Sequence, residues 1–189
     1  MEPRALPLSV IVTGSVKNLL VTGSPGVGKT TLILRAIEQV GEKCCGFYTA
    51  EIRDRGMRVG FEAVALDGTR RLFSHVGIKS PYRVGKYGVD VAGFDEFLEG
   101  IPFFDPQNFL VLIDEIGKME CLSAKFRRLA VALLDVPVPF LGTVALRGDA
   151  FIEKIKARPD VRLFLVTKEN RDDLAFEIAE TVKNLGPHV

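Results

Sequence analysis

The chain has 189 residues, which is enough for one domain with a sizeable buried core. Its formal net charge of +1 gives no excess of positive charge with which to bind nucleic acid nonspecifically. The three cysteines form no CxxC pair, and the apolar run at residues 8–13 is too short to span a membrane. We therefore expect a cytoplasmic protein that binds neither nucleic acid nor membrane.

The first predicted elements are a strand, a glycine-rich loop and a helix. The apolar run 19–22 predicts the strand, and the spacing of apolar residues over 30–40 predicts the amphipathic helix. Two Asp-to-Gly turns then separate aromatic and β-branched segments over 46–74, which predicts a small antiparallel insertion. We expect the segment 79–91 to contain a loop on one face and, after it, a short helix near 94–98 with Asp95 close to its start.

The second half of the chain alternates buried strands with helices. Strands that are apolar on both faces and alternate with helices favour an α/β fold whose sheet is mostly parallel and is covered by helices on both faces. Asn170 is a plausible cap for the last helix. The predicted strands are 109–113, 140–144 and 161–166, and the predicted helices are 125–134, 149–157 and 171–185.

The glycine-rich loop carries the clearest motif. Residues 23–30 match the phosphate-binding pattern G-x-x-x-x-G-K-[ST], and they stand between a predicted strand and a predicted helix, as this motif requires. Its glycines let backbone N–H groups surround a phosphate at a helix N-terminus. Lys29 is expected to reach the β- and γ-phosphates, and the Thr30 hydroxyl to ligate Mg²⁺. The predicted nucleotide-binding residues are Gly23, Ser24, Pro25, Gly26, Val27, Gly28, Lys29, Thr30 and Thr31.

A second copy of the tetrapeptide Val-Thr-Gly-Ser, at residues 12–15, lacks the later glycine and the Lys-Thr pair. It cannot form the same phosphate-binding loop. We expect residues 1–16 to be an N-terminal extension, either an extra strand or a segment foreign to the native protein, and residues 17–186 to form a single P-loop domain.

An acidic pair indicates what happens to the nucleotide. Asp114 and Glu115 directly follow the apolar run 109–113, as a Walker B motif does. Asp114 is predicted to hold Mg²⁺ together with Thr30. Glu115 is predicted to act as general base on the attacking water, with Lys29 as the second catalytic residue. The same segment also fits the D-x-x-G pattern of GTPases, which is weak by itself.

Four later residues are candidates for sensing the γ-phosphate or for contacting the base. Thr143 ends a predicted strand and is a candidate sensor, although simple strand packing also explains it. Arg147 is a candidate charge stabiliser. Lys168 and Asn170 stand in a segment similar to the base-reading T-K-x-D motif, with an amide where that motif has a carboxylate. This change predicts weak base discrimination, and the alternative is a helix start capped by Asn170.

Five segments together resemble one family: GSPGVGKTTL, GFYTAEIRDRGMRVGFEAVALDG, VLIDEIGKME, LGTV and VTKENRDDL. The family is that of the small P-loop nucleoside-triphosphatases of thermophilic prokaryotes, to which the vertebrate cancer-related nucleoside-triphosphatase is related. The resemblance covers residues 17–185 and implies a RecA-like α/β domain that slowly hydrolyses ATP, GTP, CTP and UTP to diphosphate and phosphate, with Mg²⁺. It also implies a second nucleotide-contacting segment, made of Leu112, Ile113, Asp114, Glu115, Ile116, Gly117, Lys118 and Met119.

Two other functions stay open from the residues alone. Six arginines cluster between residues 53 and 83, and they would suit a nucleotide or small-molecule kinase that clamps an acceptor phosphate. A GTPase-like switch that binds nucleotide to regulate a partner is the other alternative. For all three functions the expected partner is a nucleoside triphosphate, and we favour a monomer.

Overall fold

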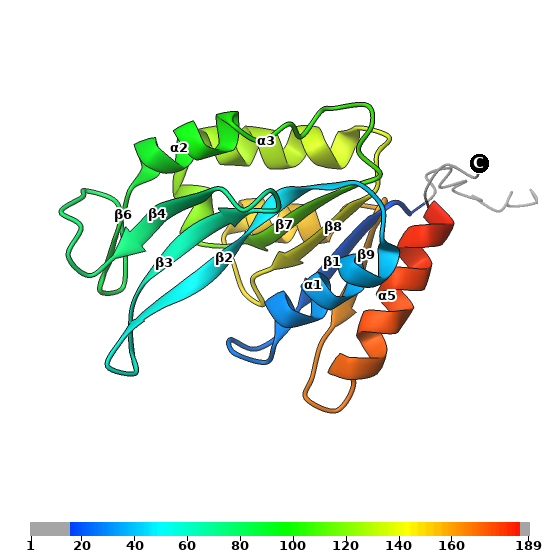
Figure 1. Cartoon of the computed structure of the whole chain (residues 1–189), viewed down its shortest axis with the longest axis horizontal. Coiled ribbons are helices and arrows are strands. Elements are labelled where there is room, and N and C mark those ends of the chain that lie inside the picture. The colour runs from blue at the N-terminus through cyan, green and yellow to red at the C-terminus, as the bar shows by residue number, and fades with distance from the viewer. Residues whose placement is uncertain (1–15, 186–189) are drawn as a thin grey trace, which may run out of the picture.

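The computed structural model describes residues 16–185, whose nine strands form one sheet (Figure 1). The strands are β1 (Asn18–Thr22), β2 (Cys44–Asp54), β3 (Met57–Ala65), β4 (Arg70–His75), β5 (Arg83–Val84), β6 (Tyr87–Val89), β7 (Leu110–Ile116), β8 (Phe140–Val144) and β9 (Val161–Leu165). They lie in the order β5-β6-β4-β3-β2-β7-β8-β1-β9. Neighbouring strands in the half β2-β7-β8-β1-β9 are parallel to each other. Neighbouring strands in the half β5-β6-β4-β3-β2 are antiparallel.

Helices cover both faces of the sheet. They are α1 (Lys29–Val40), α2 (Val91–Glu99), α3 (Ala124–Asp135), α4 (Ala150–Lys156) and α5 (Arg171–Leu185), with a short 3₁₀ helix at Glu120–Leu122. Figure 1 shows α2 and α3 over one face, and α1 and α5 over the other. Phe47, Phe94 and Phe126 belong to the first core, whereas Leu19, Ile33 and Ile178 belong to the second. The predicted α/β fold, with a mostly parallel sheet between two helical layers, is confirmed.

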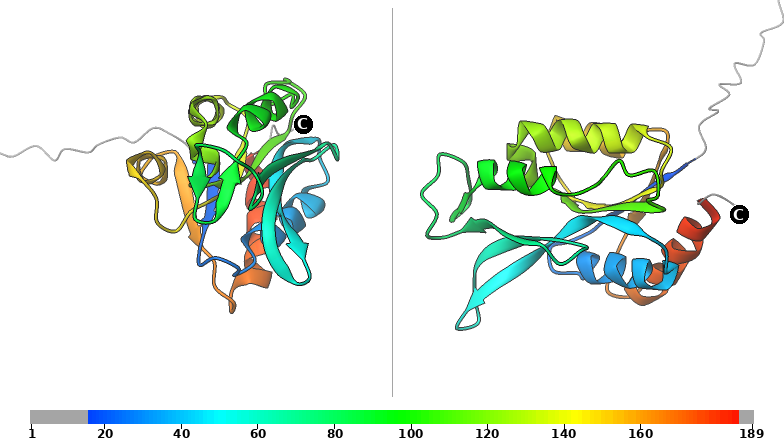
Figure 2. Two further views of the ribbon diagram at one scale, coloured as in Figure 1. Left: turned by 90° about the vertical axis from the view of Figure 1, so that its left-hand side faces the viewer. Right: turned by 45° about the horizontal axis from the view of Figure 1, so that its top comes forward.

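The antiparallel strands continue the parallel sheet rather than forming a separate layer. Strand β2 pairs with β7 through its first residues and with β3 through the rest, and the β2–β3 hairpin extends beyond the helices (Figure 2). At Gly46 (φ 130°), a Cβ would lie 1.8 Å from the Leu112 carbonyl oxygen, so this close approach of two strands requires glycine.

Two local features differ from the prediction. Besides a loop, the segment 79–91 contains the short hairpin of β5 and β6. Helix α2 begins at Val91, before the predicted start near residue 94, and it is capped by Asp90, whose carboxylate accepts a hydrogen bond from the Gly93 amide at 3.0 Å. Asp95 accepts a hydrogen bond from the Ser123 hydroxyl, and the Ser123 side chain also caps α3 by accepting a hydrogen bond from the Phe126 amide.

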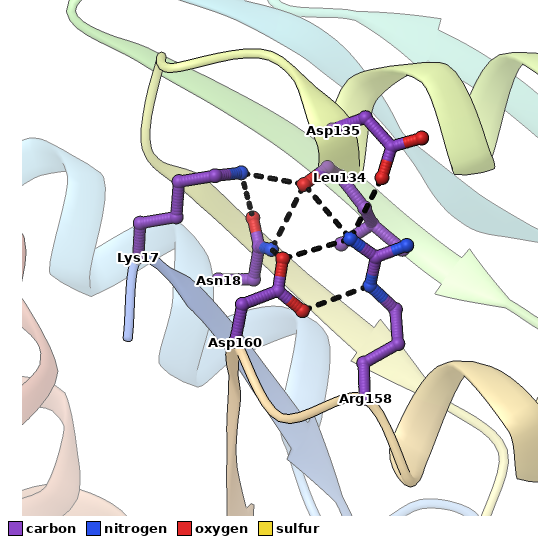
Figure 3. Close-up of polar contacts among 6 residues, drawn as sticks. All are labelled: Lys17, Asn18, Leu134, Asp135, Arg158 and Asp160. Atoms are coloured by element: carbon purple, nitrogen blue, oxygen red, sulfur yellow. Dashed lines mark hydrogen bonds and ion pairs between the residues drawn. The ribbon is translucent and has the colours of Figure 1, made fainter. Parts of the chain in front are cut away.

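A polar cluster ties together three elements at the amino ends of β1 and β9 (Figure 3). The carbonyl oxygen of Leu134, near the end of α3, accepts hydrogen bonds from Lys17 Nζ at 2.5 Å, Asn18 Nδ2 at 3.1 Å and Arg158 Nη2 at 3.3 Å. Asn18 is fully buried, and its amide also donates to Asp160 at 3.0 Å. Because the last carbonyls of a helix lack partners within the helix and carry negative partial charge, two cations and an amide stabilise this helix end.

The predicted extension at residues 1–16, including the first Val-Thr-Gly-Ser, lies outside the described residues except for Val16. Among residues 16–185, no helix combines the length and the apolar character that crossing a membrane requires.

Candidate active site

The phosphate-binding loop at residues 23–30 connects β1 to α1, as predicted. Gly26 has a φ of 75° and Gly28 a φ of 105°, which are conformations that favour glycine. Gly28 immediately precedes α1, and no side chain caps that end of the helix. The first N–H groups of α1 and its positive dipole end are therefore available to an anion.

Asp114 joins this loop to two strands. Its side chain accepts hydrogen bonds from the Thr30 hydroxyl at 2.6 Å and from the Thr143 hydroxyl on β8. Asp114 is only 2% exposed, and burial raises the pKa of its carboxyl, whereas the two hydroxyls lower it. The predicted proximity of Thr30, Asp114 and Thr143 is present because the loop after β1 meets the carboxyl ends of β7 and β8.

Glu115 contacts the lysine of the loop. Its Oε2 lies 3.6 Å from Lys29 Nζ, and this lysine also donates a hydrogen bond of 3.3 Å to the Gly23 carbonyl oxygen. Burial raises the pKa of the Glu115 carboxyl, the charge of Lys29 opposes the rise, and that of Asp114 adds to it. Both acids lie within β7, which continues to Ile116, rather than after the strand as the sequence suggested.

Sequence reasoning missed a third acid, Glu120. It is 5% exposed, and a Cβ built on Gly117 would lie 2.8 Å from both Glu115 Oε1 and Glu120 Oε2. Burial, followed by repulsion from Glu115, raises the pKa of the Glu120 carboxyl well above its ordinary value. The only signal in the sequence is its place six residues after Asp114, in a turn that reads as exposed.

Other predicted residues lie apart from these contacts. Leu112 and Ile113 pack into the two cores on opposite faces of the sheet, Lys118 is exposed, and Met119 packs against the first core. Arg147 and Lys168 are exposed. The Asn170 side chain accepts from the Thr167 amide at 2.8 Å and donates to the Leu165 carbonyl oxygen at 3.0 Å, so it closes the loop after β9 instead of capping α5.

The residue after Asn170 is a second one that sequence reasoning missed. A Cβ built on Gly28 would lie 2.9 Å from Arg171 Cδ, so the Arg171 side chain rests directly on the phosphate-binding loop. The sequence feature that could have identified Arg171 is its position just after β9, the strand next to β1. In open α/β sheets, ligands bind beyond the carboxyl ends of the strands.

A phosphate-binding loop after β1 and an acidic pair on β7, with β8 between these strands, define a P-loop nucleoside-triphosphatase with a RecA-like core. The profile of the family described as NTPase matches residues 18–179, nearly the whole described chain. The chain therefore belongs to this NTPase family, and the predictions of the family and of a nucleoside-triphosphatase enzyme are confirmed.

Named relatives agree with this membership. The chain is 40% identical over 166 residues to nucleoside-triphosphatase THEP1 of Thermotoga sp. (strain RQ2), covering 87% of this chain and 95% of that protein. It is 40% identical over 187 residues to the cancer-related nucleoside-triphosphatase of Homo sapiens, covering 89% and 97%. The crystal structure of THEP1 from Aquifex aeolicus superposes with a TM-score of 0.77 at 34% identity, covering 88% and 99%.

Proposed function

We propose that the chain hydrolyses several nucleoside triphosphates, ATP, GTP, CTP and UTP among them, to nucleoside diphosphate and phosphate. We further propose that the reaction needs Mg²⁺, is slow and discriminates weakly between bases. The observation that carries the proposal is the position of the Glu115 carboxylate, 3.6 Å from Lys29 Nζ at the phosphate-binding loop. A carboxylate held beside the lysine that is expected to contact the γ-phosphate is positioned to accept a proton from an attacking water molecule.

The proposed step is an in-line displacement. Lys29 exchanges its contacts with Gly23 and Glu115 for oxygens of the β- and γ-phosphates. Glu115 then accepts a proton from a water molecule as the water oxygen bonds to the γ-phosphorus. The bond from that phosphorus to the bridging oxygen breaks, and its electron pair leaves with the diphosphate. The raised pKa of Glu115 brings this base closer to neutrality, where general bases are most effective.

Thr30 and Asp114 are the residues that would hold Mg²⁺. Their side-chain oxygens lie 2.6 Å apart, and hard oxygen donors of this kind are the ligands that Mg²⁺ prefers. When bound, the ion would neutralise charge on the phosphate oxygens. Thr143 donates to the second oxygen of Asp114 and orients that carboxylate toward Thr30.

Two further observations support a low rate of hydrolysis and weak discrimination between bases. Among residues 16–185, the hydrogen bonds and ion pairs of Lys29, Asp114 and Glu115 include no arginine. An arginine finger typically accelerates such reactions by about 10³–10⁵-fold, so hydrolysis without one is expected to be slow. The amide of Asn170 is occupied within its own loop, which leaves it poorly placed to read a base.

The arginine cluster gives the kinase alternative little support. Arg53 and Arg58 both pair with Glu51, and Arg70 pairs with Glu62. Arg71 pairs with Glu96, and Arg83 donates to the Lys86 carbonyl oxygen. Five of the six guanidinium groups are thus already engaged with carboxylates or carbonyls, and the exposed Arg55 by itself is a poor clamp for an acceptor phosphate. Water is therefore the acceptor that we propose.

We propose a single P-loop domain that acts as a monomer in the cytoplasm and does not bind nucleic acid. The near-zero net charge and the three free cysteines, at positions 44, 45 and 121, support this.

The test is phosphate release from ATP, GTP, CTP and UTP with Mg²⁺, with and without nucleoside and nucleotide acceptors. We expect release from all four without an acceptor. Glu115→Gln should keep MgATP binding and lose about 10²–10⁴-fold in turnover, as removal of a general base does. Lys29→Ala should weaken MgATP binding and also lower turnover. Glu38→Gln, at an exposed position on α1, serves as the matched control. Release that depends on an acceptor, or unchanged turnover in Glu115→Gln, would contradict the proposal.

A further inference from the structure

The loop between β9 and α5 packs against both ends of the phosphate-binding loop. A Cβ on Gly23 would lie 2.7 Å from Val166 Cγ1, and one on Gly28 would lie 2.9 Å from Arg171 Cδ and 3.3 Å from its Nη1. Glycine at these two positions therefore admits the neighbouring loop as well as a phosphate. The guanidinium of Arg171 forms part of the wall of the phosphate-binding loop.

The charge of Arg171 lies where the fold favours an anion. Arg171 is the first residue of α5, and it contacts Gly28, which caps the start of α1. Helix N-termini carry positive partial charge, so a cation beside two of them is poorly accommodated without an anion nearby.

The protein itself gives Arg171 little compensation. The side chain is 40% exposed, but its Nε is buried and makes no hydrogen bond among the described residues. The carboxylate with which it pairs, Asp172, lies 3.4 Å from Nε, is largely exposed and also accepts a hydrogen bond from Arg35 at 3.1 Å. A buried guanidinium N–H that makes no hydrogen bond is costly unless a ligand accepts one from it.

The strand order decides which part of a nucleotide Arg171 can meet. Glu115 comes from β7, two strands from β1 on one side, whereas Arg171 follows β9, which pairs with β1 on the other side. The phosphate-binding loop lies between them. If the γ-phosphate faces Glu115, Arg171 faces the opposite end of the phosphate chain.

We propose that Arg171 binds a phosphate oxygen on the nucleoside side of the bound nucleotide, a group that triphosphates and diphosphates share. The inference rests on the proposed nucleotide site and adds a residue to it. Arg171 contributes to binding of every nucleotide regardless of base, because a phosphate carries no base identity. It does not act on the γ-phosphate in the transition state.

The experiment measures dissociation constants for MgATP, MgADP and MgGTP, together with kcat and KM, in wild type and Arg171→Ala. Loss of one charge-assisted hydrogen bond should raise all three dissociation constants by about tenfold or more. Because binding is lost equally in the ground and transition states, kcat should stay within about twofold while KM rises. Arg162→Ala removes an exposed arginine that pairs with Glu177 on the same two elements, and it should leave all values unchanged.

Arg171→Lys keeps the charge and most of the side-chain bulk, so it should fold normally. Its dissociation constants should rise less than those of Arg171→Ala. Unchanged dissociation constants in both variants would overturn the proposal. A loss of affinity confined to MgATP would also overturn it, as would a fall in kcat at constant KM. Each of these results would place Arg171 at the γ-phosphate. A wild type that binds nucleotides without releasing phosphate would refute the proposed hydrolysis and leave the binding comparison decisive for Arg171.

Discussion

Replacing Glu120 by glutamine should make the protein more stable at neutral pH. The folded state raises the pKa of this buried carboxyl well above its ordinary value of 4.5, so folding favours the protonated form. The stability that this group contributes is present below the unfolded pKa and is lost as the pH rises through the folded pKa. Glutamine is neutral at every pH, so its contribution to the unfolding free energy does not fall as the pH rises.

The size of the effect follows from proton linkage. Where folded Glu120 is protonated and unfolded Glu120 is ionised, the gap in unfolding free energy between variant and wild type widens by about 1.4 kcal/mol per pH unit. Between about pH 5 and about pH 7 the gap should therefore widen in favour of Glu120→Gln at up to this rate, for as long as the folded carboxyl keeps its proton.

The assay is urea unfolding across this pH range, in buffer with chelator and without nucleotide. Glu38→Gln removes an exposed carboxylate, and its stability should follow that of the wild type at each pH. Two results would refute the reasoning: parallel stability curves for Glu120→Gln and wild type, or a variant that loses stability relative to wild type as the pH rises.

Two further substitutions separate stability from chemistry. Asn18→Ala removes the buried amide that donates to Leu134 and Asp160, and it should lower the unfolding free energy by about 1–3 kcal/mol without changing kcat, as read by urea unfolding and phosphate release. A change in kcat would contradict the expectation that Asn18 affects stability alone. Thr143→Val removes a donor to Asp114, so the pKa of that carboxyl should rise further and Mg²⁺ should bind more weakly, as read by the Mg²⁺ dependence of phosphate release. Thr143→Ser keeps the hydroxyl and should behave as wild type; equal Mg²⁺ dependence in the valine variant would refute this role.

The phosphate-binding loop and its neighbours could be predicted because their positions follow from connectivity. The spacing within 23–30 defines the loop, and the carboxyl ends of parallel strands meet at one edge of the sheet, so Thr30, Asp114 and Thr143 had to lie close together. Long apolar runs such as 109–113 likewise predict buried strands. These features depend on the backbone pattern and little on individual side chains.

The residues that were missed depend on packing distances that no pattern records. Arg171 reaches Gly28 only because the loop after β9 packs closely on the phosphate-binding loop. Glu120 is buried by a tight 3₁₀ turn in a segment whose composition suggests exposure. The two-residue strand β5 is too short for any periodicity, and the start of α2 at Val91 depends on the capping hydrogen bond that Asp90 accepts.

The cluster around the Leu134 carbonyl and the nucleotide site lie at opposite ends of the same parallel strands. The side chains of this cluster can therefore stabilise the fold without contacting the nucleotide site, because the length of the sheet separates the two. A designer who wished to make the protein more heat-resistant can work on Lys17, Arg158 and Asp160 without disturbing the chemistry. One who wished to alter the chemistry can work at the other end without first reinforcing the scaffold.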